Sequence, residues 1–137
     1  MRLLITDPVA IAVDAGDVVS LRAEDASGGF GVLAGHADFL TVLSISVVSW
    51  RHADGRAGYC AVRGGILTVS GGSDVSIATR EAHVGDDLDQ LETVVLAGYR
   101  AHIESERMER TASARLRMQA IRHMIEALDG APKAIDL

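Results

Sequence analysis

The hydrophobic pattern changes its period near residue 86, and this change is the strongest constraint on the fold. Of the 14 glycines, 12 lie between Gly16 and Gly85, where short apolar runs are separated by turn-forming residues. Beyond that point, apolar residues recur every three or four positions, as they do on one face of a helix. The chain therefore divides into a β-rich part, residues 1–85, and a helical part, residues 86–137.

The first part is predicted to contain only β-strands. Apolar and polar residues alternate over 19–23 and 75–79, while 45–50 and 66–69 are rich in β-branched residues. Asp54-Gly55 and Gly71-Gly72 lie between such runs, where hairpin turns need residues that tolerate positive φ. Many short strands at close spacing favour an antiparallel sandwich or barrel over βαβ units.

The second part is predicted to be helical, and Asp86 or Asp87 can cap its start. Two stretches show the helical spacing: Leu88, Leu91, Val95, Tyr99 and His102, then Leu116, Ala120, Met124 and Leu128. Thr111 or Ser113 could cap a second helix. Residues 104–113 contain no glycine or proline, so one long helix is equally compatible with the sequence.

Composition excludes several classes of protein. The chain has 137 residues, a net charge of −6 and only 13 basic residues, which does not suit a nucleic-acid-binding protein. No apolar run approaches the ~20 residues needed to cross a bilayer, and the N-terminus becomes polar too early for a secretory signal. The single cysteine, Cys60, cannot form an internal disulfide. We expect a soluble, cytoplasmic protein.

No group of residues is arranged as a catalytic site. The glycine-rich segment 28–36 lacks the lysine and hydroxyl residue of a phosphate-binding loop, and strand-like residues follow it. The five histidines are scattered, Cys60 lies in an apolar run, and no Gly-x-Ser-x-Gly motif occurs. We expect no catalytic residue, no metal site and no cofactor. The arginines interleaved with glutamates in the helical part are typical of a solvated face or a docking surface.

Two segments resemble the epsilon subunit of F-type ATP synthases, which is called delta in mitochondria. Residues 30–41 read FGVLAGHADFLT, which is similar to the family segment Gly-Val-x-Pro-Gly-His-Ala-Pro-Leu-Leu-Thr with its preceding residues. Residues 63–69 read RGGILTV, which is similar to the family segment Ser-Gly-Gly-Ile-Leu-Glu-Val. A helical part opening with Asp87-Leu88-Asp89 follows, so the resemblance covers nearly the whole chain.

The resemblance implies a β-sandwich of about ten antiparallel strands, residues 1–85, followed by a C-terminal α-helical hairpin, residues 86–137. It implies a non-catalytic rotor subunit in the central stalk, coupling ion flow through the ring of c subunits to ATP synthesis on other subunits. Its partners would be the gamma subunit and the c ring. The helices could also contact the alpha and beta subunits and inhibit ATP hydrolysis. The complex would be peripheral, on the cytoplasmic face of the bacterial inner membrane.

The resemblance also assigns binding roles to individual residues. The positions that match the gamma-binding face of the sandwich are His36, Thr41, Arg63 and Thr68. The positions that match the part facing the c ring are Gly28, Gly29 and Phe30. Glycines would let the two backbones approach closely, and alternate residues on a sheet would form one patch.

The sequence departs from the family pattern at several positions. Ala34 and Asp38 replace prolines, and Arg63 replaces a small polar residue, so a partner carboxylate is expected near Arg63. These departures point to the divergent, second-operon type of bacterial ATP synthase, in which the coupling ion can be sodium.

Nucleotide binding is not expected at the position where some bacterial members bind ATP. Leu88 and Asp89 match the start of the family's Ile/Leu-Asp-x-x-Arg-Ala motif, but Glu92 stands in place of its arginine. A carboxylate there would repel phosphate.

Two other functions are compatible with the residues alone. The first is a free-standing β-sandwich module that binds a ligand or nucleotide under a helical cap, which would show ligand-dependent stabilisation. The second is a hydrolase on a small β-barrel, for which the sequence offers no base–nucleophile pair.

Overall fold

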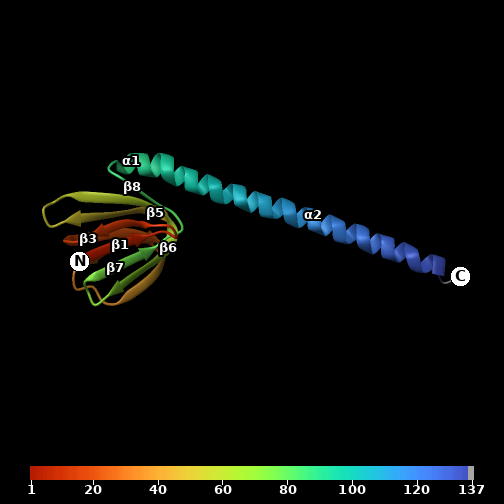
Figure 1. Cartoon of the computed structure of the whole chain (residues 1–137), viewed down its shortest axis with the longest axis horizontal. Helices are drawn as coiled ribbons and strands as arrows, with labels where there is room; N and C mark the ends of the chain where they lie inside the picture. The colour runs from red at the N-terminus through yellow and green to blue at the C-terminus, as the bar shows by residue number, and fades with distance from the viewer. Residues whose placement is uncertain (136–137) are drawn as a thin grey trace. The chain divides into compact units, whose positions relative to one another are not determined.

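The structure is a computed structural model that describes residues 1–135. Eight strands come first (Figure 1): β1 (Arg2–Thr6), β2 (Ile11–Ala15), β3 (Val18–Asp25), β4 (Gly28–Leu33), β5 (Phe39–His52), β6 (Ala57–Ser70), β7 (Asp74–Ala78) and β8 (Ala82–Gly85). A short helix α1 (Leu88–Gln90), a π-helical turn η1 (Leu91–Leu96) and a long helix α2 (Ala97–Ile135) follow. Contacts divide the chain into one compact unit, Met1–Arg100, and a second unit that begins at Ala101.

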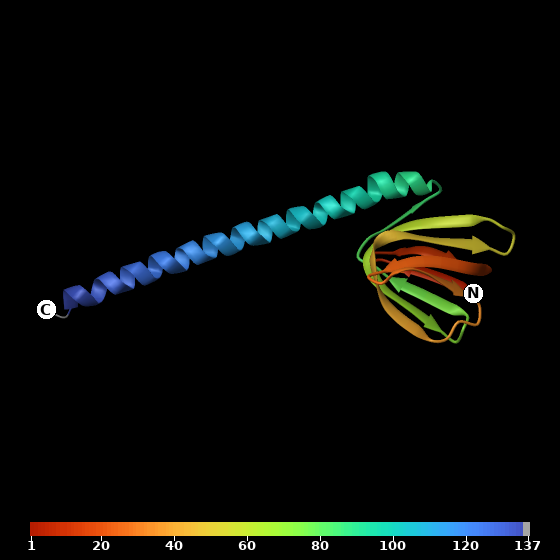
Figure 2. The ribbon, with the colours of Figure 1, turned by 180° about the vertical axis from the view of Figure 1, so that it is seen from behind.

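The two longest strands determine the architecture of the first unit. β5 and β6 have 14 residues each and pair with one another along their length. The second half of β6 pairs with β7, whereas its first half pairs with β8. Between the halves, Gly64 and Gly65 have positive φ, and the paired register skips from Leu43↔Gly65 to Ile45↔Arg63. This irregularity lets each long strand belong to both layers of a sandwich (Figure 2).

The remaining strands extend the sheet on both sides of this central pair. The strand order is β2-β1-β7-β6-β5-β3-β4, with β8 pairing with β6 outside this path. Most neighbours are antiparallel, but β1 and β7 run parallel. The expected turns are present, since Gly55, Gly71 and Gly72 all have positive φ between paired strands.

The predicted sandwich is confirmed, but the expected number of about ten strands is wrong, since the first unit has eight. Strands β5 and β6 each continue without a break through their irregular point. Each strand therefore contributes a segment to both layers but counts only once. Counting their halves separately would bring the number to ten. The purely antiparallel expectation is also wrong because of the β1–β7 pair.

The inward side chains of both layers form one apolar core. Its fully buried members include Leu3, Ile5, Leu21, Leu67 and Ile77, which alternate with outward residues along their strands. The Cys60 thiol belongs to this core, and its burial raises the pKa to about 11. This agrees with the prediction that Cys60 is a small buried residue.

The predicted helical hairpin is wrong, because α2 is a single helix of 39 residues. Thr111 does not cap a second helix, since its hydroxyl donates to the Arg107 carbonyl one turn earlier, at 3.0 Å. That bond lets a threonine remain within a helix. With no glycine or proline in 104–113, nothing interrupts the backbone bonds, and the alternative of one long helix is the one observed.

Within residues 1–135, no helix combines the length and apolar character required to cross a membrane.

Candidate partner-binding surfaces

Part of one outer face of the sandwich is apolar and is not covered within the first unit. We call it the open face and define it by Leu40, Val42, Ile66, Thr68 and Ala78. The register brings these residues together, because Leu40 pairs with Thr68, Val42 pairs with Ile66, and Ile66 pairs with Ala78. Their neighbours along each strand point into the core, as the period of two requires.

The open face exposes more apolar surface than a solvated strand needs. Leu40 and Val42 are each 65% exposed, and Ile66 is 47% exposed. None of the five residues carries a charge, and they lie on three adjacent strands of a rigid sheet. A contiguous apolar patch without charges is typical of the centre of a protein–protein interface.

The other half of the central pair has an outer face that is covered. There Ala61 is fully buried, and Ile45, Val47 and Tyr59 are partly buried beneath Leu91, Leu96 and Tyr99. Asp87 begins this covering segment, because its side chain accepts hydrogen bonds from the backbone N–H groups of Asp89 and Gln90. The segment therefore packs as part of the first unit, which runs to Arg100.

Tyr99 closes this packed region at the edge nearest Arg63. Burial raises the pKa of Tyr99 to about 12, and the Glu81 carboxylate contributes in the same direction. The Tyr99 hydroxyl is buried and has no hydrogen-bond partner among the described residues. The Tyr99 side chain therefore contributes packing, and burial keeps its phenol in the neutral form.

These two raised pKa values predict that stability falls at high pH. Cys60 and Tyr99 keep their protons in the folded chain up to about pH 11 and 12, whereas in the unfolded chain they lose them near 9.0 and 10.0. The contribution is therefore fully present below about pH 9 and is lost as the pH rises through the folded values. Urea unfolding from pH 8 to 11 measures this slope. The Cys60→Ala/Tyr99→Phe double variant should flatten it, and an unchanged slope would contradict the assignment.

The four predicted gamma-binding residues do not share one face. Thr68 lies on the open face, whereas Thr41 points to the opposite side, where its hydroxyl donates to Asp25 at 2.7 Å. Arg63 lies beside the covered face, with its guanidinium 3.5 Å from Glu81. His36 lies in the loop before β5, and its ring is 5.7 Å from that of Phe39.

A carboxylate of this chain, that of Glu81, lies beside Arg63, and the partner carboxylate expected there stays a prediction. The backbone N–H of Arg63 also donates to the Glu81 carbonyl at 3.0 Å, and its side chain is only 14% exposed. Sequence reasoning placed Arg63 by its motif and missed Leu40, Val42, Ile66 and Ala78. The alternation of apolar and polar residues could not identify them, because they are apolar residues on an outward face.

The predicted c-ring residues Gly28, Gly29 and Phe30 begin strand β4 at the tip of the β3–β4 hairpin. Gly28 pairs with Asp25 and has a φ of 118°, a conformation that suits glycine. Asp25 holds the tip by accepting bonds from the backbone and hydroxyl of Ser27. Phe30 packs edge-on against Phe39, with ring centroids 5.6 Å apart. The tip is therefore ordered, and its glycines leave the backbone accessible.

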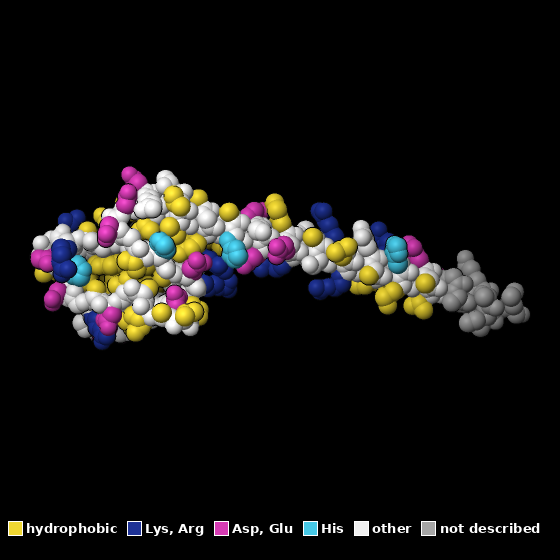
Figure 3. All heavy atoms as spheres, turned by 45° about the horizontal axis from the view of Figure 1, so that its top comes forward, with side chains coloured by type: hydrophobic (Ala, Val, Ile, Leu, Met, Phe, Trp, Pro, Cys, Tyr) yellow, Lys and Arg dark blue, Asp and Glu magenta, His cyan; other side chains and the backbone are white. Residues whose placement is uncertain are grey.

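In the second unit, the side chains of 107–129 are all exposed. The exposed apolar ones are Met108, Leu116, Met118, Ile121, Met124, Ile125 and Leu128. Arginines are interleaved with them (Figure 3), and Arg110, Arg115, Arg117 and Arg122 form no ion pair with another described side chain. Such a helix is amphiphilic and suited to a protein partner.

The residues at the positions of the nucleotide motif lie at the start of the helical segment. Leu88 and Asp89 lie in α1, and Glu92 lies in the first turn of η1, where all three are exposed. The Asp89 and Glu92 carboxylates lie at the positive end of the helix dipole, which accounts for the acidic residues there. Among the described residues, no group of three histidine, cysteine or carboxylate side chains could hold a metal ion.

Comparison with known protein families gives a match over most of the sandwich unit. The family described as ATP synthase, Delta/Epsilon chain, beta-sandwich domain matches residues 1–85. The ATP synthase epsilon chain 2 of Cereibacter sphaeroides is 42% identical over 134 residues, which are 98% of this chain and 92% of that protein. The epsilon chain 2 of Paraburkholderia xenovorans is 42% identical over 128 residues, covering 93% of this chain and 92% of the relative.

Solved structures give the same fold at lower identity. A chain in the Euglena gracilis mitochondrial ATP synthase, OSCP/F1/c-ring, aligns with a TM-score of 0.57 and 24% identity, covering 66% of this chain and 57% of that one. A chain in the Tetrahymena thermophila mitochondrial ATP synthase, central stalk/c-ring, aligns with a TM-score of 0.53 and 14% identity, covering 74% and 89%.

Proposed function

Since this chain belongs to the epsilon family of F-type ATP synthase central-stalk subunits, we propose that it binds the gamma subunit through its open face. An epsilon chain is a non-catalytic subunit, so its function depends on the surfaces it offers to its neighbours. Family membership decides against a free-standing binding module and against a hydrolase.

The observation that carries the proposal is the uncharged apolar patch on rigid strands. Leu40, Val42 and Ile66 together expose enough apolar surface that covering them by a partner is favourable. A sheet holds these side chains in fixed positions, so little conformational entropy is lost on binding. A rotor subunit that transmits torque requires such a stiff contact.

We further propose that the β3–β4 tip contacts the c ring. The residues Gly28, Gly29 and Phe30 match the family's ring-facing segment, and the missing side chains allow close backbone approach. This arrangement would fix the chain peripherally on the cytoplasmic face of the bacterial inner membrane. It would join the gamma subunit to the ring, so that ion flow through the ring drives rotation.

The names of the relatives support assignment to the second type of bacterial ATP synthase. Both relatives at 42% identity are called epsilon chain 2. The sequence departures at Ala34 and Asp38 point in the same direction.

Site-specific cross-linking in the assembled complex tests both contacts. Ile66→Cys on the open face and Ser27→Cys at the hairpin tip each receive a thiol-reactive photo-cross-linker, in a Cys60→Ala background. Ile66 and Ser27 are exposed, so labelling does not require unfolding. The expected products are epsilon–gamma from position 66 and epsilon–c from position 27.

A matched control for labelling is Leu33→Cys, which lies on the outer face of the other layer and is also exposed. We expect no gamma product from position 33. A gamma product from position 33 and none from position 66 would contradict the placement of the gamma subunit on the open face.

The long helix α2 is proposed to restrain ATP hydrolysis by contacting other subunits. Its exposed apolar and arginine side chains need a partner surface, and a long helix can dock in one arrangement and leave it in another. Contacts with the alpha and beta subunits would supply that surface.

Truncation after Arg100 is expected to raise the ATPase activity of the assembled complex at least about twofold. This boundary keeps Leu91, Leu96 and Tyr99 packed on the sandwich, so the variant differs from the full chain only in the second unit. Truncation after Gly85 is a poorer test because it uncovers Ala61. Steady-state ATPase assays of matched complexes provide the measurement, and unchanged activity would mean that the helix has only a structural role.

A further inference from the structure

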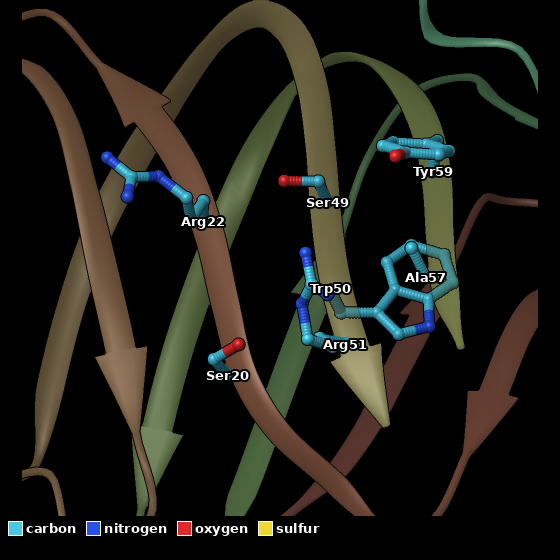
Figure 4. Close-up of a pocket in the computed structure, with 7 residues that line it drawn as sticks. All are labelled: Ser20, Arg22, Ser49, Trp50, Arg51, Ala57 and Tyr59. Carbon is cyan, nitrogen blue, oxygen red and sulfur yellow. The ribbon is translucent and has the colours of Figure 1, made fainter. Parts of the chain in front are cut away.

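A small hollow on the outer face of β3, β5 and β6 is lined by hydrogen-bond donors. Its volume is about 100 Å³, and its polar lining comes from Ser20, Arg22, Ser49, Arg51 and Tyr59 (Figure 4). Trp50 and Ala57 complete the lining. These residues lie away from the open face and belong to the first unit.

The strand register brings the polar residues together. Ser20 pairs with Arg51 and Arg22 pairs with Ser49 across β3 and β5, while Ser49 pairs with Tyr59 across β5 and β6. The intervening Leu21 and Trp50 point into the core. Two arginines therefore occupy diagonal positions on one face, at a separation that long side chains can bridge.

The two arginines have no counter-charge in the described part of the chain. Arg2 pairs with Asp14, and Arg56 pairs with Asp54, but Arg22 and Arg51 form no ion pair with any described residue. No carboxylate lines the hollow. Glu24, the next outward residue of β3, forms no ion pair with Arg22. In a chain with a net charge of −6, this is a local concentration of positive charge.

We propose that this hollow binds a phosphate group. Every polar side chain that lines it can donate a hydrogen bond, and two are guanidinium groups, whose planar donors match phosphate oxygens. A hollow of this size accepts a tetrahedral oxyanion, but it is smaller than the pockets that enclose whole organic ligands. The site is separate from the nucleotide motif at the start of α1.

Binding requires one side-chain movement. Arg51 lies over the hollow between Ser20 and Ser49, whereas the Arg22 guanidinium extends to the other side of β3 (Figure 4). Arg22 is exposed and forms no ion pair with a described residue, so rotation about its side-chain bonds meets little resistance. Arg51 and the hydroxyl groups provide the first contacts, and Arg22 closes on the bound anion.

Isothermal titration calorimetry provides the readout, because the Trp50 side chain points into the core and does not report on the hollow directly. The full chain is titrated with pyrophosphate at constant ionic strength while the heat of binding is recorded. A second titration uses phosphatidylcholine vesicles that contain phosphatidate, which distinguishes a lipid headgroup from a soluble phosphate. We expect a saturable change in the millimolar range in at least one titration.

Three variants make the test specific. Arg51→Gln should raise the dissociation constant at least about tenfold, and Arg22→Gln/Arg51→Gln should abolish saturation. Arg80→Gln is the matched control, since Arg80 is exposed, forms no ion pair with a described residue and does not line the hollow. It should bind as the unmodified chain does. Circular dichroism confirms that each variant is folded.

Three results would overturn the proposal: no saturable change with either probe, equal weakening by Arg80→Gln and Arg51→Gln, or equally tight binding of a glutamate oligopeptide. The last result would identify a surface for acidic protein segments instead. None of these outcomes depends on the gamma contact, because the experiment uses the epsilon chain alone.

Discussion

Replacing Gly65 with alanine is expected to lower the free energy of unfolding by about 3 kcal/mol. Gly65 has a φ of 119°, a region that side chains with a Cβ rarely occupy. A Cβ there would also collide with the Ala78 carbonyl and lie 2.8 Å from Thr79 Cα. Both atoms belong to backbone, so they cannot move without disturbing the β6–β7 pairing. Chemical denaturation followed by circular dichroism measures the change.

Gly28→Ala separates the two causes. Gly28 has nearly the same φ, 118°, but an added Cβ would have nothing within 4 Å. Gly28→Ala should therefore lower the free energy of unfolding by only about 1.5 kcal/mol, from the backbone conformation alone. Equal losses for Gly65→Ala and Gly28→Ala would contradict the view that the close approach of strands β6 and β7 requires Gly65.

Replacing Ile66 with aspartate is expected to weaken gamma binding at least about 30-fold. Ile66 lies at the centre of the open face, between Val42 on one neighbouring strand and Ala78 on the other. A carboxylate placed there would be buried without a partner in the complex, whereas in the free chain it remains in water. The fold should therefore be unaffected. Isothermal titration of purified gamma measures the affinity.

Leu33→Asp is the matched control for Ile66→Asp. It makes a similar change at an exposed apolar residue on a different outer face. The affinity of Leu33→Asp for gamma should stay within about twofold of the unmodified chain. If both variants lose affinity equally, the effect is one of net charge and not of the open face.

Much of the fold could be predicted from the hydrophobic period. The turn residues Asp54-Gly55 and Gly71-Gly72 predicted hairpins. The change of period at residue 86 predicted a β-sandwich followed by a helical segment. The hydrophobic period could not show that β5 and β6 each contribute to both layers of the sandwich. That contribution depends on Gly64 and Gly65 adopting positive φ in the middle of a strand, where a glycine pair equally well predicts a turn.

The binding surfaces were harder to predict because motifs locate loops better than they locate faces. Thr41 and Arg63 fall within the matching segments, yet one contacts Asp25 and the other contacts Glu81. Leu40 and Ile66 are exposed apolar residues of the open face, but an outward isoleucine cannot be told from an inward one before the register is known. The gamma and c-ring assignments of individual residues remain predictions.

Co-expression with the gamma subunit from the same source, followed by size-exclusion chromatography with light scattering, tests the central claim most directly. The claim is that this chain is held in the central stalk by its open face. We expect a stable one-to-one complex at micromolar concentration for the unmodified chain and for Leu33→Asp. Ile66→Asp should elute as a separate, folded chain. An unmodified chain that remains separate from folded gamma would contradict the claim, as would an Ile66→Asp variant that still forms the complex.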